Sequence, residues 1–219
     1  MISDKEFYEI GIDNVVAYSG KDLTDDLIKR CFKLDTAFYR QEFQWDKFEI
    51  DKIIKKYPQF CFIFVDKNRG NIVGYSYWFP IKTSILQEFI NNKTALLNIK
   101  EEYCMEYQKP YVNLFLGGEA FTSGYDLNNL HIAVENLFQN HALMLAKKGI
   151  KIALVAFDSV CAYDEQFLVP KTNMKNCIKK ANCNFYYDKY DPNKFYKDSK
   201  YCNALKAFYE QQIPQKNTH

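Results

Sequence analysis

The chain of 219 residues has little glycine and proline, no long hydrophobic run and almost no net charge. Its 8 glycines are about half the usual share, and with only 6 prolines there is little material for flexible linkers. No stretch approaches the roughly 18 consecutive apolar residues that cross a bilayer. The net charge of +2 disfavours a dedicated nucleic-acid or membrane-surface binder. We therefore expect one domain over residues 1–219, with no membrane and no nucleic-acid partner.

Cysteine occurs in an odd number that fits no disulfide framework. The 7 cysteines are widely spaced, and none forms a Cys-x-x-Cys pair. Cys177, Cys183 and Cys202 are suitable zinc ligands by type, but their spacing matches no zinc motif, so we expect no metal site. Residues 1–7 carry charges where a signal peptide needs apolar residues. Reduced thiols and a cytoplasmic location follow as expectations.

Hydrophobic periodicity predicts a mixture of strands and helices. Strands are expected at 14–19, 60–66, 72–79, 110–118, 150–157, 184–187 and, by a narrow margin over a helix, 201–209. Helices are expected at 22–39, 46–56, 85–90, 126–148 and 172–180. Residues 188–200 read as an exposed polar loop and residues 211–219 as a frayed tail. The strand–helix–strand order over 110–157 predicts a right-handed crossover between parallel strands.

This order of elements resembles the GCN5-related N-acetyltransferase (GNAT) superfamily over roughly residues 12–208. Three segments carry the resemblance: residues 60–79 with the turn sequence Gly-Asn-Ile-Val-Gly-Tyr, residues 112–149, and residues 148–156 with their Lys-Gly-Ile step. The resemblance implies an α/β (α+β) fold, with a mixed, mostly antiparallel twisted sheet flanked by helices and a helical insertion between the third and fourth strands. Residues 81–109 form that insertion, either as a plain connection or as a cover over a cleft.

The resemblance also implies a function and a donor site. It implies an acyl-CoA-dependent N-acyltransferase, in the simplest case an N-acetyltransferase that uses acetyl-CoA and acts on a small amine or a peptide amine. In the family, the exposed backbone of the fourth strand pairs with the pantetheine arm, and the next loop binds the pyrophosphate at a helix N-terminus. The matching cofactor-binding positions are Gly117, Gly118, Ala120, Thr122, Ser123, Gly124 and Tyr125. A homodimer is compatible with this interpretation.

Two departures from the family pattern keep an alternative function open. The loop after the fourth strand has one glycine and no Arg or Gln at its first position, and Asp126 adds a negative charge near the expected phosphates. Residues 175–185 lack the family's helix tyrosine and its Gly-Phe step. The alternative is a catalytically inactive GNAT-fold module for ligand sensing or protein interaction. Nucleic-acid binding rests only on the Tyr- and Lys-rich residues 185–201, which we expect to be a solvated loop.

Amine acylation by a thioester needs a base for the ammonium proton and an acid for the departing thiolate. Glu119 lies at the end of the fourth predicted strand, where the family often has its base, and the alternative is that it caps a strand end in water. Tyr187 and Tyr163 are the candidate acids, although a single member of 17 tyrosines more often packs than reacts. His131 and His141 are expected to be structural residues of the long helix.

Overall fold

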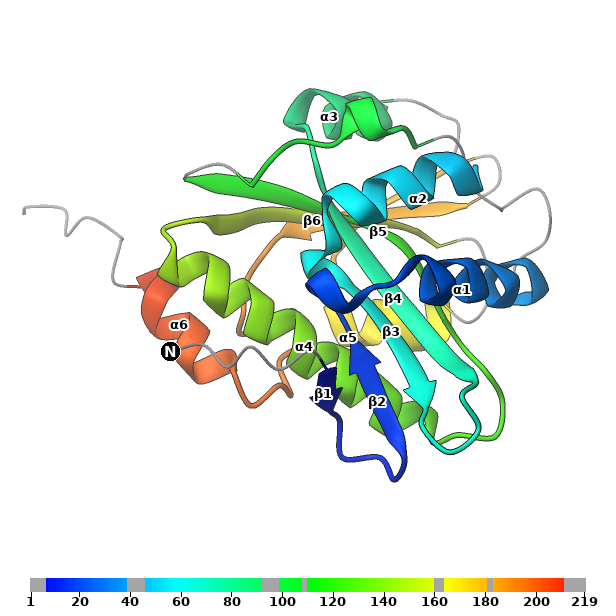
Figure 1. Cartoon of the computed structure of the whole chain (residues 1–219). Helices are drawn as coiled ribbons and strands as arrows, with labels where there is room; N and C mark the ends of the chain where they lie inside the picture. Colours follow the sequence, from blue (N-terminus) through cyan, green and yellow to red (C-terminus); the bar gives the residue numbers. More distant parts are fainter. Residues whose placement is uncertain are drawn as a thin grey trace, which may run out of the picture.

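A twisted eight-stranded sheet forms the centre of the protein (Figure 1). The computed structural model describes residues 7–38, 46–91, 99–107, 110–159, 164–180 and 183–210. The strands are β1 (Phe7–Glu9), β2 (Val15–Tyr18), β3 (Cys61–Asp66), β4 (Ile72–Ile81), β5 (Tyr111–Phe121), β6 (Lys151–Ser159), β7 (Asn176–Lys179) and β8 (Asn184–Lys189). Their order is β1-β2-β3-β4-β5-β6-β8-β7, and only β5 and β6 are parallel. The predicted mixed, mostly antiparallel sheet with a parallel crossover is confirmed.

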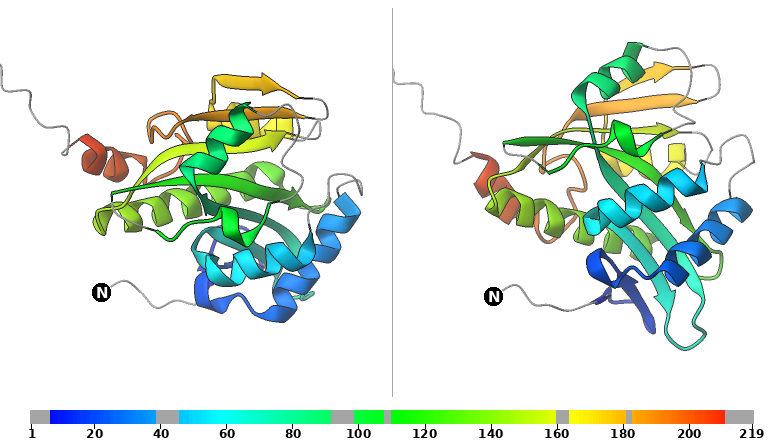
Figure 2. Two further views of the ribbon diagram at one scale, coloured as in Figure 1. Left: turned by 90° about the horizontal axis from the view of Figure 1, so that it is seen from above. Right: turned by 45° about the horizontal axis from the view of Figure 1, so that its top comes forward.

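Helices cover both faces of this sheet (Figure 2). One face carries α1 (Asp25–Phe38), α2 (Lys47–Lys56) and α3 (Thr83–Asn91), and we call it the α1 face. The other carries α4 (Leu127–Lys147), α5 (Val169–Thr172) and α6 (Cys202–Glu210), and we call it the α4 face. The predicted helical insertion is confirmed, because α3 and the short helix η4 (Glu101–Tyr103) lie between β4 and β5. Within the described ranges, no helix has the length and hydropathy needed to cross a membrane.

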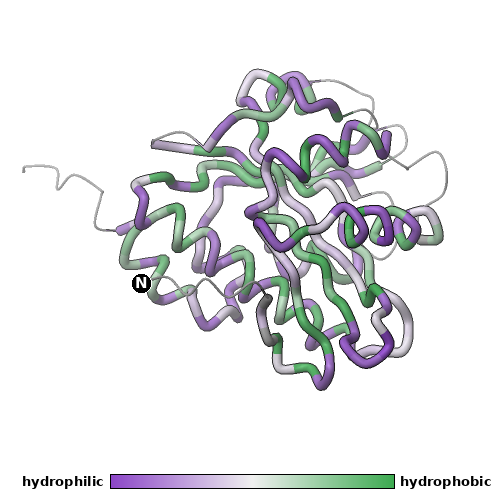
Figure 3. Tube along the Cα trace, in the orientation of Figure 1, coloured by the Kyte–Doolittle hydropathy of each residue, from purple (hydrophilic) through white to green (hydrophobic). Residues whose placement is uncertain are grey.

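Strand geometry explains why β4 is apolar along almost its whole length. Alternate side chains of a strand point to opposite faces, so Tyr75, Tyr77 and Phe79 join the core of the α1 face while Trp78 joins that of the α4 face. Because helices cover both faces, both sets of side chains are buried. The central strands are accordingly hydrophobic, whereas the turn between β3 and β4 is hydrophilic (Figure 3).

Local capping fixes where the main helices begin. Asp46 accepts hydrogen bonds from the backbone of Phe48 at 2.9 Å and of Glu49 at 3.4 Å at the start of α2. Asp126 does the same for α4, accepting from Asn128 N at 2.9 Å. Each cap satisfies amides that the first helical turn leaves without partners. The sequence predicts both starts to within a residue.

Two predictions for the last quarter of the chain are wrong in element type. The helix expected over 172–180 is replaced by β7, because Asn173 adopts a left-handed φ of 50° and ends α5. The strand expected over 201–209 is the helix α6, whose Leu205 is fully buried against the α4 face. The short strand β1 was not expected at all.

The polar loop expected over 188–200 is also wrong in its exposure. Tyr190, Phe195 and Tyr196 are buried in the core of the α4 face, and Phe138 of α4 packs on all three rings. Gln139 donates to the Phe195 carbonyl at 2.6 Å, which ties this segment to α4. The aromatic side chains of the segment therefore belong to the core, and they are not available to stack on nucleic-acid bases.

Candidate active site

β5 loses one of its two neighbours halfway along its length. Its parallel pairing with β6 runs from Tyr111 to Leu116, which lies opposite Phe157. On its other edge, β5 stays paired with β4 as far as Phe121. The two parallel strands then diverge (Figure 1). Residues 117–121 therefore present a backbone edge toward the gap between the described strands β5 and β6.

A β-bulge lies at the point where the strands separate. Tyr77 pairs with Gly118 and Trp78 with Leu116, so Gly117 is the extra residue. A Cβ atom at Gly117 would lie 2.3 Å from Tyr77 Cε2 and 2.4 Å from an atom of the Phe79 ring. Two buried aromatic rings thus fill the space above Gly117, and only glycine fits below them.

The Tyr77 hydroxyl lies directly over this bulge. Tyr77 is 4% exposed, and a Cβ atom on Gly118 would lie 3.0 Å from its hydroxyl oxygen. Among the described residues this hydroxyl makes no hydrogen bond. Burial, followed by the charge of Asp35, raises the pKa of Tyr77 well above its ordinary value, so the phenol keeps its proton at neutral pH. The phenol therefore has a donor and an acceptor that the described residues do not use.

Tyr75 connects the bulge to helix α1. Its ring stacks on that of Tyr77 with 5.4 Å between centroids and 18° between planes. Its hydroxyl donates a hydrogen bond to the carboxylate of Asp35 on α1. Burial raises the pKa of Asp35 from its ordinary value, while the Tyr75 hydrogen bond and the charge of Lys47 act in the opposite direction. Two tyrosines and one carboxylate therefore lie together on the α1 face beside Gly118.

The Glu119 side chain points to the α4 face of the sheet, opposite to Tyr75 and Tyr77. Its side chain has no exposed surface, and its Oε1 lies 3.2 Å from Nδ1 of His131 on α4. Phe167, in the short helix η5 (Asp164–Leu168), stacks on the His131 ring at 5.3 Å. The alternative that Glu119 caps a strand end in water is wrong, because α4 and η5 cover this part of the α4 face.

The two candidate acids have different positions relative to the bulge. Tyr187 of β8 pairs with Ala156 of β6 and packs, half-buried, against the core of the α1 face. It therefore shares a face with Tyr77, while Glu119 lies on the other. Tyr163 falls outside the described residues.

The loop between β5 and α4 is anchored to the turn between β3 and β4. The backbone N–H of Thr122 donates to the Val73 carbonyl at 2.7 Å, and the Thr122 hydroxyl reaches the same oxygen at 3.0 Å. The Tyr125 hydroxyl donates to Asp66 at 2.8 Å, and this hydrogen bond is the first cause that raises the pKa of Tyr125 and lowers that of Asp66. Both side chains are thus engaged within the protein and hold the loop in position.

The centre of the loop is open to solvent. Ser123 and Gly124 are exposed, and Gly124 adopts a φ of 97° that favours glycine. In the part of the chain that the structure describes, the N–H groups of residues 123–125 donate no hydrogen bond. Asp126 occupies the next amides as the cap of α4. Three backbone N–H donors therefore remain for an anion. The negative charge of the adjacent Asp126 carboxylate would repel that anion.

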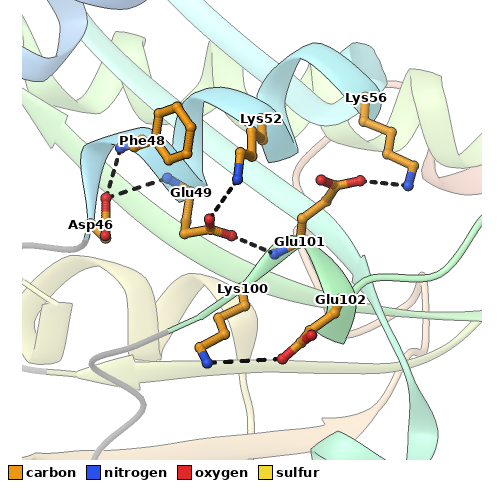
Figure 4. Close-up of polar contacts among 8 residues, drawn as sticks. All are labelled: Asp46, Phe48, Glu49, Lys52, Lys56, Lys100, Glu101 and Glu102. Carbon is orange, nitrogen blue, oxygen red and sulfur yellow. Dashed lines mark hydrogen bonds and ion pairs between the residues drawn. The ribbon is translucent and has the colours of Figure 1, made fainter.

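The insertion between β4 and β5 is attached to α2 by polar contacts (Figure 4). The Glu101 N–H donates to Glu49 Oε2 at 3.1 Å, and Lys56 Nζ donates to Glu101 Oε1 at 2.6 Å. Lys52 Nζ lies 2.8 Å from Glu49 Oε1. Ile99 at the start of this segment is buried in the core of the α1 face. The described part of the insertion is therefore packed against α2 and the core of the α1 face.

A cavity of about 400 Å³ lies elsewhere, on the α4 face under β6 and β8. Its lining includes Val155, Met174, Asp188 and Phe195. Val155 pairs with Leu114 of β5, before the two strands separate, and none of residues 117–121 lines the cavity. The cavity is thus separate from the bulge.

Sequence analysis misses Tyr77 and Asp35, although each leaves a signal. Tyr75 and Tyr77 are two residues apart in a strand, which places both side chains on one face. Asp35 follows Leu27 and Cys31 at steps of four residues, which places a carboxylate on the buried side of a helix. A charged residue at such a position indicates a partner or a function.

No model of a known protein family matches this sequence, and comparison with curated proteins finds no match either. Solved structures do match. The loading GNATL domain of CurA from Lyngbya majuscula is 15% identical with a TM-score of 0.53, over 81% of this chain and 97% of that one. The GphF GNAT-like decarboxylase in complex with isobutyryl-CoA is 11% identical with a TM-score of 0.52, over 79% and 98%. A chain of the NatC complex bound to Gag peptide and CoA is 9% identical with a TM-score of 0.52, over 80% and 96%. At these identities the likeness shows the fold: the chain has the GNAT fold.

Proposed function

We propose that the protein is an acyl-CoA-dependent N-acyltransferase that uses acetyl-CoA to acylate a small amine or a peptide amine. The observation that carries this proposal is the open edge of β5, which begins at a glycine bulge and leads into the N-terminus of α4. An extended pantetheine arm needs such an edge, because it pairs like an added strand. Two structures with the same fold are described as complexes with CoA or isobutyryl-CoA, which supports the choice of donor.

The donor would lie along residues 117–120, with its pyrophosphate on the loop that follows. The free N–H groups of Ser123, Gly124 and Tyr125 are suitable donors for phosphate oxygens. Thr122 would position the loop rather than bind phosphate, because both its donors are used by Val73. Asp126 would weaken binding through its charge.

The bulge supports acetyl rather than a larger acyl group. The rings of Tyr77 and Phe79 fill the space above Gly117, and they are 4% and 2% exposed. On this side a short acyl group would meet less steric hindrance from the two rings than a branched or long one. We therefore propose acetyl-CoA as the donor substrate.

The chemistry needs one nucleophile and two proton movements. The neutral amine nitrogen attacks the thioester carbon, the C–S bond breaks, and the nitrogen loses a proton while the departing thiolate gains one. Tyr77 and Tyr187 lie on the α1 face, and their phenols are candidate donors to the thiolate. Glu119, the base that the family resemblance implies, contacts His131 on the α4 face and has no exposed surface, so the amine would lose its proton to water.

The six described cysteines are free thiols, which supports a reducing compartment such as the cytoplasm.

A second function is favoured by the loop itself. Much of its hydrogen-bonding capacity is already used by Val73, Asp66 and the cap of α4. A GNAT-fold module that binds CoA as a signal, or that binds another protein, needs no turnover and would tolerate this loss.

Two measurements separate these functions. Thermal unfolding with and without acetyl-CoA tests binding, and a ligand at about one hundred times its Kd adds about 2.7 kcal/mol, a shift of several degrees. Release of free thiol in the presence of a panel of primary amines tests turnover. We expect both a shift and thiol release. A shift without thiol release would favour the sensing module, and no shift at millimolar acetyl-CoA would exclude both.

A further inference from the structure

We infer that Asp35, together with the hydroxyl groups of Tyr75 and Tyr77, binds the ammonium group of the acceptor. The acceptor is then an aliphatic amine that is cationic at neutral pH, rather than an aromatic amine or an alcohol. This inference rests on the proposed function, because it describes the acceptor side of the same site.

Asp35 is a partly buried carboxylate with no ion pair to another described residue. Within the described ranges, no Lys, Arg or His nitrogen lies within 4 Å of it. The charge of Lys47 lowers the pKa of Asp35, and Lys47 Nζ itself donates to Thr36 Oγ1 at 2.5 Å. Among the described residues, the Tyr75 hydroxyl donates a hydrogen bond to the Asp35 carboxylate. A carboxylate withdrawn from water normally has a cationic partner, so this position favours a ligand that brings one.

Tyr77 gives an independent reason to expect a ligand here. The Tyr77 side chain is 4% exposed, and its hydroxyl makes no hydrogen bond with the described residues and lies over Gly118. Its ring stacks on Tyr75, the residue that contacts Asp35. The side chains of Asp35, Tyr75 and Tyr77 thus follow one another in space from α1 to the bulge.

The chemistry of these groups selects the ligand. An ammonium group has three donors and no acceptor, whereas Asp35 and the two phenol oxygens can all accept. An alcohol carries no charge to pair with Asp35, and an aromatic amine is neutral at pH 7. An ammonium group held here lies next to the open edge of β5, where the thioester is proposed to bind.

The test is binding of n-butylamine to the whole protein in the presence of CoA, which lacks an acyl group and cannot react. Titration calorimetry compares the parent with Asp35→Asn and Tyr77→Phe. The control variant is Asp26→Asn, which changes a carboxylate on the same helix that is 75% exposed and pairs with Arg30. The neutral control ligand is 1-butanol. Asn keeps an oxygen for the Tyr75 hydroxyl, so the variant retains its local structure.

We expect Asp35→Asn to weaken n-butylamine binding by at least about tenfold, which corresponds to about 1.4 kcal/mol. Tyr77→Phe should weaken it by a smaller factor, and Asp26→Asn should leave it unchanged. Butanol should not compete. Equal affinity in the parent and in Asp35→Asn, or no amine binding at about ten millimolar, overturns the inference.

The proposed function is tested separately by CoA in the same titrations. If CoA binds and the amine does not, the transferase proposal stands and the Asp35 site is wrong. If the amine binds through Asp35 and CoA does not bind, the Asp35 site stands and the transferase proposal fails.

Discussion

Two adjacent glycines in β5 differ in the space above them, and this difference can be tested by a matched pair of variants. A Cβ atom at Gly117 would lie within 2.4 Å of both Tyr77 and Phe79, whereas at Gly118 the nearest atom is the Tyr77 hydroxyl at 3.0 Å. Gly117→Ala should lower the unfolding free energy by about 1–3 kcal/mol, because buried rings cannot move aside. It should also weaken acetyl-CoA binding, since the bulge shapes the edge of β5.

Gly118→Ala is the control for this prediction. The end of one phenol ring can shift by a few tenths of an ångström, so this variant should lose less stability than Gly117→Ala. Urea unfolding and acetyl-CoA titration of both variants measure the difference. Equal stability of Gly117→Ala and the parent would mean that the rings do not hold the bulge.

Glu119 is the predicted site residue whose burial argues most directly against its proposed role as a base. A base must exchange protons with the amine, but the side chain of Glu119 has no exposed surface and contacts His131 under α4. We therefore expect Glu119→Gln to keep kcat/KM within about threefold of the parent, because the amide oxygen can still accept from His131. A fall of about 10²–10⁴ in kcat/KM with an unchanged melting temperature would instead establish Glu119 as the base.

Single residues are where sequence reasoning was weakest. The chain has 17 tyrosines, and the spacing of Tyr75 and Tyr77 puts them on one face of a strand but does not show that the Tyr77 ring lies over Gly118. The glycine pair was easier, because two adjacent glycines at the end of an apolar run predict a special backbone. What could not be derived is the burial of Glu119, since it depends on where α4 and η5 pack.

At the scale of elements, His141 joins three parts of the α4 face. Its Nδ1 donates to the Gln59 carbonyl in the short helix η3 (Pro58–Phe60), and its Nε2 accepts from the Tyr8 hydroxyl at 3.2 Å. Burial lowers its pKa from 6.5 to about 4, although the Gln59 hydrogen bond acts in the opposite direction. The imidazole is therefore neutral in the folded protein under conditions where it is charged in the unfolded chain.

This predicts a pH dependence of stability with a defined sign. Between about pH 6.5 and pH 4 the unfolded chain binds one proton more at His141 than the folded chain, so stability falls as the pH falls. From pH 6.5 to 5 the parent should lose about 2 kcal/mol more unfolding free energy than His141→Gln. Denaturant unfolding at both pH values measures this. Parallel losses in the two proteins would show that His141 is not held neutral.

Helices and strands were predicted correctly where the spacing of apolar residues fitted one element type, and wrongly where the spacing and the residue types favoured different elements. The long helix α4 has unbroken helical spacing, and its start at Asp126 was predicted from the capping residue. In α6, Tyr201, Leu205 and Tyr209 also follow a helical spacing of four, but the run is short and rich in β-forming aromatics. Packing decides this case, because Tyr209 accepts from the backbone of Ile152 at 2.8 Å.

At the scale of the whole molecule, the fold was predicted from the resemblance of the element order to the GNAT superfamily, although no family model matches the sequence. The buried hairpin and the strand–helix–strand crossover that carry this resemblance are both present. Function is less accessible, since unrelated chemistries share one fold and the site depends on a few side chains. Here those side chains come from α1, β4, β5 and β8, which are far apart in the sequence.

The central claim is that acetyl-CoA pairs with the open edge of β5, and amide hydrogen exchange tests it most directly. In the free protein, the N–H groups that face the gap beyond Leu116 and those of residues 123–125 have no partner among the described residues. With millimolar acetyl-CoA, exchange of the gap-facing N–H groups of residues 117–121 and of the N–H groups of residues 123–125 should slow markedly, while exchange in the already paired residues 111–116 should change little. Unchanged exchange over 117–125, or protection confined to the cavity under β6 and β8, would contradict the account.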